Sequence, residues 1–143
     1  MSKFKYFELT EFLRSNKARE LRIDNSPTFE IVEHIEELVG NILDPLRAAY
    51  GMPIKVTSGY RCAELNKVVG GVVGSVHQLG RACDLQVGGS FDKFVVFVVD
   101  WFKKTGTKFD QILVESANGV KWLHIGQYNN VGQQRGIIKT IVK

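Results

Sequence analysis

Apolar residues recur at helical spacing through the first third of the chain. Between residues 27 and 49, isoleucines and leucines stand three or four positions apart, which is the spacing of one helix face. Ser26 can cap this helix, and Pro27 suits its first position because the N–H that proline lacks has no partner there. A Gly-Met-Pro sequence follows and ends the pattern. We therefore expect a long helix over residues 27–49, kinked at Pro45, after a short amphipathic helix over residues 7–15.

The rest of the chain is richer in strand patterns. Alternating polarity or β-branched composition between turn residues predicts strands at residues 54–57, 82–87, 108–116, 120–128 and 136–142. Asn118 and Gly119, between two of these segments, form the commonest short hairpin signal. A short helix closed by two glycines is expected over residues 62–69.

Residues 90–106 contain many valines, which suit a strand as well as a helix. Ser90 can cap a helix, Asp92 lies in its first turn, two lysines lie in its last turn and Gly106 follows. These end signals favour a helix. Because apolar residues lie on most of its sides, we expect it to be deeply packed.

Helices early in the chain and strands later are typical of an α+β fold. We expect the N-terminal helices to pack on a small, mostly antiparallel sheet that carries the functional residues. The chain has no internal repeat, low-complexity segment or Pro/Ser-rich linker. We therefore interpret residues 1–143 as a single domain, with a helical part at 1–50 and a core at 51–143 that holds the candidate site.

Composition narrows the class of protein. Of the 143 residues, 44% are hydrophobic and 24% are charged, a profile typical of soluble globular domains. A formal charge of +4 and a pI near 9.1 favour an anionic partner only mildly, because the basic residues are scattered. We therefore expect no nucleic-acid partner. No apolar run approaches the roughly 20 residues of a membrane helix, so we expect no membrane partner either.

The first residues of the chain and its two cysteines are informative about the cellular compartment in which the protein is made. No continuous apolar segment or small-residue cleavage site follows Met1, so we expect synthesis in the cytoplasm without a signal peptide. Cys62 and Cys83 are too few for a disulfide framework, and their spacing is not that of a CxxC metal site. We interpret them as reduced thiols. As a separate expectation, we take the protein to be a monomer.

Residues with candidate chemical roles lie in and near the segment SVHQLGRACD. His77 and Asp84 flank Gly80, so a reversal of the chain there can bring the two side chains together. A buried ion pair, a pH switch and a metal site are all compatible with this pair. His124, on a later predicted strand, offers a third ligand. Two imidazoles and one carboxylate match a catalytic zinc site whose fourth position is left to water.

A water at such a site needs a general base within hydrogen-bond reach. Glu115 comes at the end of a predicted strand and can lie at the same edge of the sheet as His124. Taken singly, a histidine in a strand is more often without a chemical role, and a residue such as Glu115 is most often solvated. The residue pattern alone therefore leaves the zinc site as one of several interpretations.

Three segments, SGYRCAELN, SVHQLGRACDL and WLHIG, together resemble the signature of the zinc D-alanyl-D-alanine carboxypeptidase and L-alanyl-D-glutamate peptidase family. The resemblance covers roughly residues 54–128, more than half of the chain. Its most specific part keeps the family motif S-x-H-x-x-G-x-A-x-D in register at Ser75, His77, Gly80, Ala82 and Asp84. Many members are bacterial cell-wall peptidases or phage endolysins. The related hedgehog signalling domain shares the fold and the metal triad.

The resemblance implies roles for particular residues. One zinc ion would be held by His77, Asp84 and His124. Arg61 would bind a substrate carboxylate or carbonyl oxygen and would stabilise the developing oxyanion. Ser75 would supply a hydroxyl to the binding site near the first ligand.

The catalytic base departs from the commonest family pattern. Many members place an acid three residues before the last histidine, where this chain has Lys121. The hedgehog-type stretch F-D-x-x-x-x-E is matched here by FDQILVE, so Glu115 is predicted to be the base. Trp122 is expected to form an apolar wall of the substrate cleft, with a position in the core as the alternative.

These features predict a zinc-dependent peptidase that cleaves peptidoglycan stem peptides, either as a carboxypeptidase or as an endopeptidase. We expect a phage or prophage endolysin-like enzyme that acts on the cell wall after release at lysis. The alternative is a non-catalytic, zinc-containing module of the same fold that binds the cell wall or a protein. A nucleic-acid binder is the third interpretation.

Overall fold

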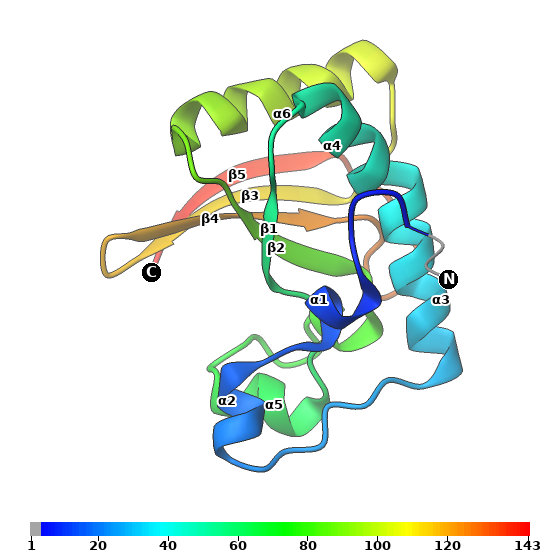
Figure 1. Cartoon of the computed structure of the whole chain (residues 1–143), viewed down its shortest axis with the longest axis vertical. Coiled ribbons are helices and arrows are strands. Elements are labelled where there is room, and N and C mark those ends of the chain that lie inside the picture. The colour runs from blue at the N-terminus through cyan, green and yellow to red at the C-terminus, as the bar shows by residue number, and fades with distance from the viewer. Residues whose placement is uncertain (1–3) are drawn as a thin grey trace.

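The computed structural model describes residues 4–143, and its centre is a five-stranded sheet in the order β1-β2-β4-β3-β5 (Figure 1). The strands are β1 (Lys55–Ser58), β2 (Ala82–Gln86), β3 (Gln111–Ala117), β4 (Val120–Gly126) and β5 (Ile137–Val142). Neighbouring strands are antiparallel except for β3 and β5, which run parallel. The expected α+β class with a mostly antiparallel sheet is confirmed.

The expected long helix is present as three consecutive segments: α3 (Phe29–Leu38), the π-helical turn η1 (Val39–Leu43) and α4 (Asp44–Tyr50). At the end of η1, the N–H of Asp44 bonds the carbonyl of Val39, five residues earlier. Pro45 follows directly and has no N–H with which to continue the regular ladder. The irregularity expected at Pro45 therefore takes the form of a widened turn just before it.

Two helix starts differ from the prediction. Thr28, not Ser26, caps α3, because its hydroxyl accepts a backbone N–H of the first turn. The expected N-terminal helix is instead two short helices, α1 (Leu9–Leu13) and α2 (Asn16–Glu20). Ser15 separates them, because its hydroxyl accepts a backbone N–H of α2 and so begins a new helix.

The valine-rich segment forms the helix α6 (Phe91–Thr105), capped by Ser90 and ended by Gly106 as its end signals predicted. Its burial was predicted wrongly. The fully or nearly fully buried side chains lie on one face of the helix: Phe94, Val98 and Phe102. Val96 is 69% exposed, so α6 is amphipathic. It lies beside α4 and contacts the sheet through β4 (Figure 1), covering the core rather than being surrounded by it.

Side-chain alternation divides the sheet into an apolar and a polar face. Residues such as Ile125 are fully buried among the helices on the apolar face. The residues between them point to the polar face. There, Asp84 of β2 lies opposite His124 of β4, and Glu115 of β3 lies opposite Trp122 of β4. The sheet register thus brings the candidate site residues to one face.

Two short helices precede β2: α5 (Ala63–Val68) and the 3-10 turn η2 (Val76–Leu79). Gly80 ends η2 with a φ of 70°, in the left-handed region. A Cβ at this position would lie 2.9 Å from the Ile31 carbonyl oxygen and 3.2 Å from Ile35 Cγ1, both in α3. Glycine is therefore needed for the turn and for the close approach of η2 to α3.

Both cysteines of the chain, Cys62 and Cys83, are free thiols. Cys83 lies fully buried on the apolar face of the sheet, and this burial raises the pKa of its thiol.

None of the helices formed by residues 4–143 combines the length and the apolar character that a membrane span requires.

Asp110, just before β3, anchors the segment that leads into β5. Its carboxylate accepts hydrogen bonds from Arg135 Nε at 2.8 Å and Arg135 Nη2 at 2.9 Å, and only 1% of the Asp110 side chain is exposed. Its carbonyl accepts the N–H of Ile137 at 2.9 Å. Burial raises the pKa of Asp110, but the hydrogen bonds from Arg135 outweigh it and hold the pKa below its ordinary value.

We predict that Gly80→Ala lowers the free energy of unfolding by about 1–3 kcal/mol, because the new Cβ adds left-handed strain and a close contact with α3. Gly88→Ala is the matched control, since nothing lies within 4 Å of a Cβ at Gly88 and its φ is not left-handed. Urea denaturation measures both. Equal stability of the two variants would contradict the role given to Gly80.

We predict that the free energy of unfolding of the Asp110→Asn variant falls less than that of the wild type when the pH is lowered. In the wild type, the paired carboxylate contributes fully above the unfolded pKa of about 3.9, and this contribution is lost as the pH falls through the lower folded pKa. Asparagine cannot ionise, so the variant should be less stable at neutral pH by about 1–2 kcal/mol and should change less in acid. Equilibrium unfolding between about pH 2 and pH 7 checks this, and parallel pH profiles of the two proteins would refute it.

Candidate metal centre

The candidate metal centre lies on the polar face of the sheet, where η2, β2 and β4 meet. These elements supply His77, Asp84 and His124, respectively. The hydroxyl oxygen of Ser75 accepts the N–H of His77 at 3.2 Å, and Gly80 closes the same turn. The reversal of the chain thus places His77 beside Asp84, and the pairing of β2 with β4 adds His124.

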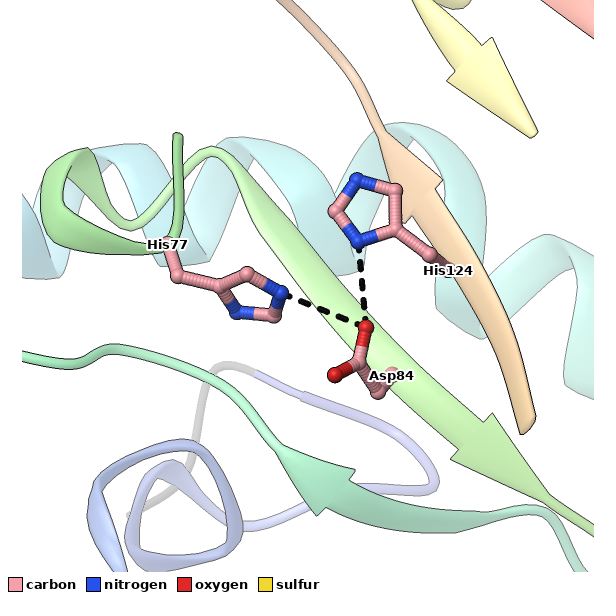
Figure 2. Close-up of side chains that lie close together, drawn as sticks. All are labelled: His77, Asp84 and His124. Atoms are coloured by element: carbon pink, nitrogen blue, oxygen red, sulfur yellow. Dashed lines mark hydrogen bonds and ion pairs between the residues drawn. The ribbon is translucent and has the colours of Figure 1, made fainter. Parts of the chain in front are cut away.

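Figure 2 shows both imidazole rings directed at one oxygen of Asp84. His77 Nε2 lies 3.2 Å from Asp84 Oδ1, and His124 Nδ1 lies 3.0 Å from the same atom. The ligand-capable atoms of the three residues all lie within 4.8 Å of one another. All three residues are buried, with 2% of His77, 8% of Asp84 and 6% of His124 exposed.

The second ring nitrogen of His77 is held by the backbone. His77 Nδ1 lies 2.7 Å from the carbonyl oxygen of Gly59. Because a carbonyl oxygen can only accept, Nδ1 carries the hydrogen in this contact. Nε2, 3.2 Å from Asp84 Oδ1, is then the ring nitrogen that a metal ion would bind once it is deprotonated. A backbone partner of this kind fixes both the tautomer and the ring orientation of a metal-ligating histidine.

The three residues fit a zinc ion. Tetrahedral zinc with ligand bonds of about 2.0–2.2 Å places its ligand atoms about 3.3 Å apart. The two nitrogen–oxygen distances to Asp84, 3.2 and 3.0 Å, are close to this value. Burial raises the pKa of Asp84, but its charge interactions and hydrogen bonds with His77 and His124 outweigh this and hold the pKa well below its ordinary value. The carboxylate is therefore in the ionised form that binds metal.

Glu115 lies next to this centre, on the same face of the sheet. It is 6% exposed, and its Oε1 lies 4.0 Å from His124 Nδ1. The indole N–H of Trp122 donates to Oε1 at 3.3 Å, and Lys143 Nζ lies 2.8 Å from Oε2. Glu115 lies within β3, near its end, and its side chain is held on both carboxylate oxygens.

The two lysines in this region differ in position. Lys121, which stands at the usual acid position of the family pattern, points to the opposite face from Trp122 because adjacent strand residues alternate. Its side chain is exposed and lies 4.0 Å from Asp92. Lys143 was not predicted. It reaches Glu115 because β5 runs parallel to β3 with Ile141 opposite Glu115, and no sequence signal shows that pairing.

Arg61 follows β1 and adjoins the first ligand. Its backbone N–H donates to the His77 carbonyl at 3.1 Å. Burial lowers the pKa of Arg61, and the nearby carboxylates of Asp84 and Glu115 act in the opposite direction. Its Nε is buried and has no hydrogen-bond partner among residues 4–143. An anionic or carbonyl oxygen from a ligand could therefore satisfy it.

The other two predicted site residues also lie close by. Ser75 is half-buried and caps η2 through its hydroxyl oxygen, so it has a local structural role whether or not it contacts substrate. Trp122 is half-buried on the polar face beside Glu115, with Lys143 Nζ 5.6 Å from its ring centroid. It is therefore not part of the apolar core. Contact of either residue with substrate remains a prediction.

Comparison with known proteins agrees with this geometry. The family model for Peptidase M15 matches residues 5–120, most of the chain, and the chain belongs to the Peptidase M15 family. Members of this family are zinc-dependent peptidases, and the His-Asp-His centre is consistent with a metallopeptidase. The matched range includes His77 and Asp84 but ends before His124, which is placed by its register with Asp84. No curated protein gives a significant match.

We predict that the protein binds one zinc ion per chain and that Asp84→Asn weakens zinc binding by at least about a hundredfold, because a charged ligand is lost. Isothermal titration calorimetry measures the affinity, and thermal unfolding with zinc or EDTA provides a second readout. Asp100→Asn is the matched control, since this carboxylate is exposed on α6 and pairs with Lys104. Unchanged zinc affinity in Asp84→Asn would contradict the proposed centre.

Proposed function

We propose that the protein is a zinc-dependent peptidase that hydrolyses the stem peptides of peptidoglycan. The observation that carries this proposal is the buried carboxylate of Glu115, 4.0 Å from His124 Nδ1. A three-residue metal centre with a neighbouring carboxylate provides the groups that hydrolysis of a peptide bond needs. Membership of the Peptidase M15 family supports peptidase activity. The resemblance of SVHQLGRACDL to cell-wall peptidases supports stem peptides as the substrate.

In the proposed enzyme, His77, Asp84 and His124 would hold the zinc ion. A zinc ion bound there would polarise the scissile carbonyl and lower the pKa of a water molecule. The chain itself supplies the proton transfer. Glu115 accepts a proton from the attacking water and delivers it to the leaving amine when the peptide bond breaks.

Two neighbours support Glu115 in this role. The hydrogen bond from Trp122 and the ion pair with Lys143 hold one carboxylate oxygen each. The carboxylate is therefore oriented, with Oε1 directed toward His124. Oε1 is the oxygen that we assign to the proton transfer, because it is the one nearer to the metal centre.

Arg61 is proposed to bind a carboxylate or carbonyl oxygen of the substrate and to stabilise the developing oxyanion. Its buried, unpaired Nε supports this role. The hydroxyl of Ser75 uses its oxygen as an acceptor within η2, so its hydrogen remains available to a substrate carbonyl. Trp122 would form a wall of the cleft beside Glu115.

The proposed setting is a phage or prophage endolysin-like enzyme that acts on the cell wall, as a carboxypeptidase or an endopeptidase. The alternative is a zinc-containing module of the same fold that binds the cell wall or a protein without turnover. Membership of the Peptidase M15 family favours the enzyme. The two functions differ in whether product is formed.

We predict that the zinc-loaded wild type releases fragments from purified muropeptides and that mass spectrometry of the products locates the cleaved bond. Glu115→Gln should keep its zinc and lose activity by about 10²–10⁴-fold, because the general base is removed. Glu20→Gln, an exposed residue paired with Lys17, is the control. Full activity of Glu115→Gln would exclude this base, and no product from the wild type would favour the binding module.

A further inference from the structure

A cavity of about 580 Å³ lies along β1, outside the group of three metal-ligand candidates. All four residues of β1 line it, together with residues of α1, of α2 and of the segment that contains Arg61. α1 packs against β1 (Figure 1). No residue of β2 lines the cavity, so the cavity opens on the side of β1 that faces away from the rest of the sheet.

β1 is an edge strand, because it pairs with β2 alone in the sheet. Among residues 4–143, no other segment makes a backbone hydrogen bond to residues 55–58 from outside the sheet. The outer backbone N–H and C=O groups of β1 therefore have no backbone partner among these residues, and the cavity lies against them. An open strand edge can accept an extended peptide through main-chain hydrogen bonds.

One end of the cavity lies near the metal centre. Ser58, at the end of β1, lines the cavity and lies opposite Asp84 in the register of β1 with β2. Arg61 also lines the cavity, and its backbone N–H donates to the His77 carbonyl. The Ser58 end of the cavity is therefore the end nearer to the metal centre, and α1 borders it there, where the N–H of Tyr60 donates to the Phe12 carbonyl at 2.7 Å.

The wall of the cavity is rich in positive charge. Arg14, Lys55 and Arg61 line it, against one acidic residue, Glu11. One oxygen of the Glu11 carboxylate already accepts the N–H of Glu8 at 2.7 Å. Arg14 and Lys55 are exposed, and within residues 4–143 neither forms an ion pair. These two cations are therefore free to bind an anionic group.

We propose that Arg14 and Lys55 determine substrate specificity by holding a carboxylate of an acidic peptide that lies extended along the outer edge of β1. This inference rests on the proposed peptidase function and adds to it the charge of the substrate. The scissile bond lies at the metal centre, and the recognised carboxylate belongs to a residue away from that bond. A stem peptide whose free carboxylate is amidated binds less well, because a carboxamide offers no charge to either cation.

The experiment compares two synthetic stem peptides that differ only in this group, a free carboxylate or a carboxamide. Isothermal titration calorimetry with the zinc-loaded Glu115→Gln variant measures binding without turnover, and wild-type hydrolysis of each peptide is measured separately. The carboxylate peptide should bind about tenfold more tightly. Introducing Arg14→Gln into the Glu115→Gln variant should remove most of this preference for the carboxylate peptide over the carboxamide peptide. Arg19→Gln is the control, because Arg19 is exposed on α2 and does not line the cavity.

The position of the bound peptide is measured separately, by NMR. In ¹⁵N-labelled protein, addition of the carboxylate peptide should shift the backbone amide signals of residues 55–58. Equal binding of both peptides, or binding that leaves these signals unchanged, overturns the inference while wild-type cleavage still supports the proposed function. If the Glu115→Gln variant binds neither peptide and the wild type cleaves neither, the inference and the proposed function both fail.

Discussion

The pairing of β2 with β4 is the constraint on which the site depends. It sets Asp84 opposite His124 and makes one Asp84 oxygen the shared partner of two buried imidazoles. A buried carboxylate is costly without such partners. A shift of β2 by one residue would turn Asp84 toward the apolar core and Cys83 toward the site, because side chains alternate along a strand. The stability of the sheet and the assembly of the metal centre therefore require the same register.

The first ligand depends on support from outside the sheet. His77 Nδ1 is held by the Gly59 carbonyl, and His34 of α3 lies with its Nδ1 2.6 Å from the Leu79 carbonyl at the end of the same turn. Gly80 allows that turn to approach α3 closely. The N-terminal helices thus do more than cover the core. They hold in place the 3-10 turn from which His77 would bind the metal ion.

The parts of the structure that rest on local chemistry could be predicted from the sequence. The turn at Gly80 and the strands follow from short patterns, whereas the grouping of His124 with His77 and Asp84 followed from the resemblance to the peptidase family. The choice of Thr28 over Ser26 as a cap could not be predicted, because two hydroxyl residues flank one proline and the Ser26 hydroxyl instead donates to Asp24 at 2.6 Å. The contact of Lys143 with Glu115 depends on the parallel pairing of β5 with β3, which is a long-range feature without a local signal.

If two imidazole nitrogens and one carboxylate oxygen bind zinc on the polar face of the sheet, X-ray absorption at the zinc edge of the zinc-loaded protein will show it. We expect four nitrogen or oxygen ligands at about 2.0–2.2 Å, with outer-shell scattering from two imidazole rings. A sulfur ligand at about 2.3 Å, from Cys62 or Cys83, or a shell of oxygens without imidazole, would contradict it.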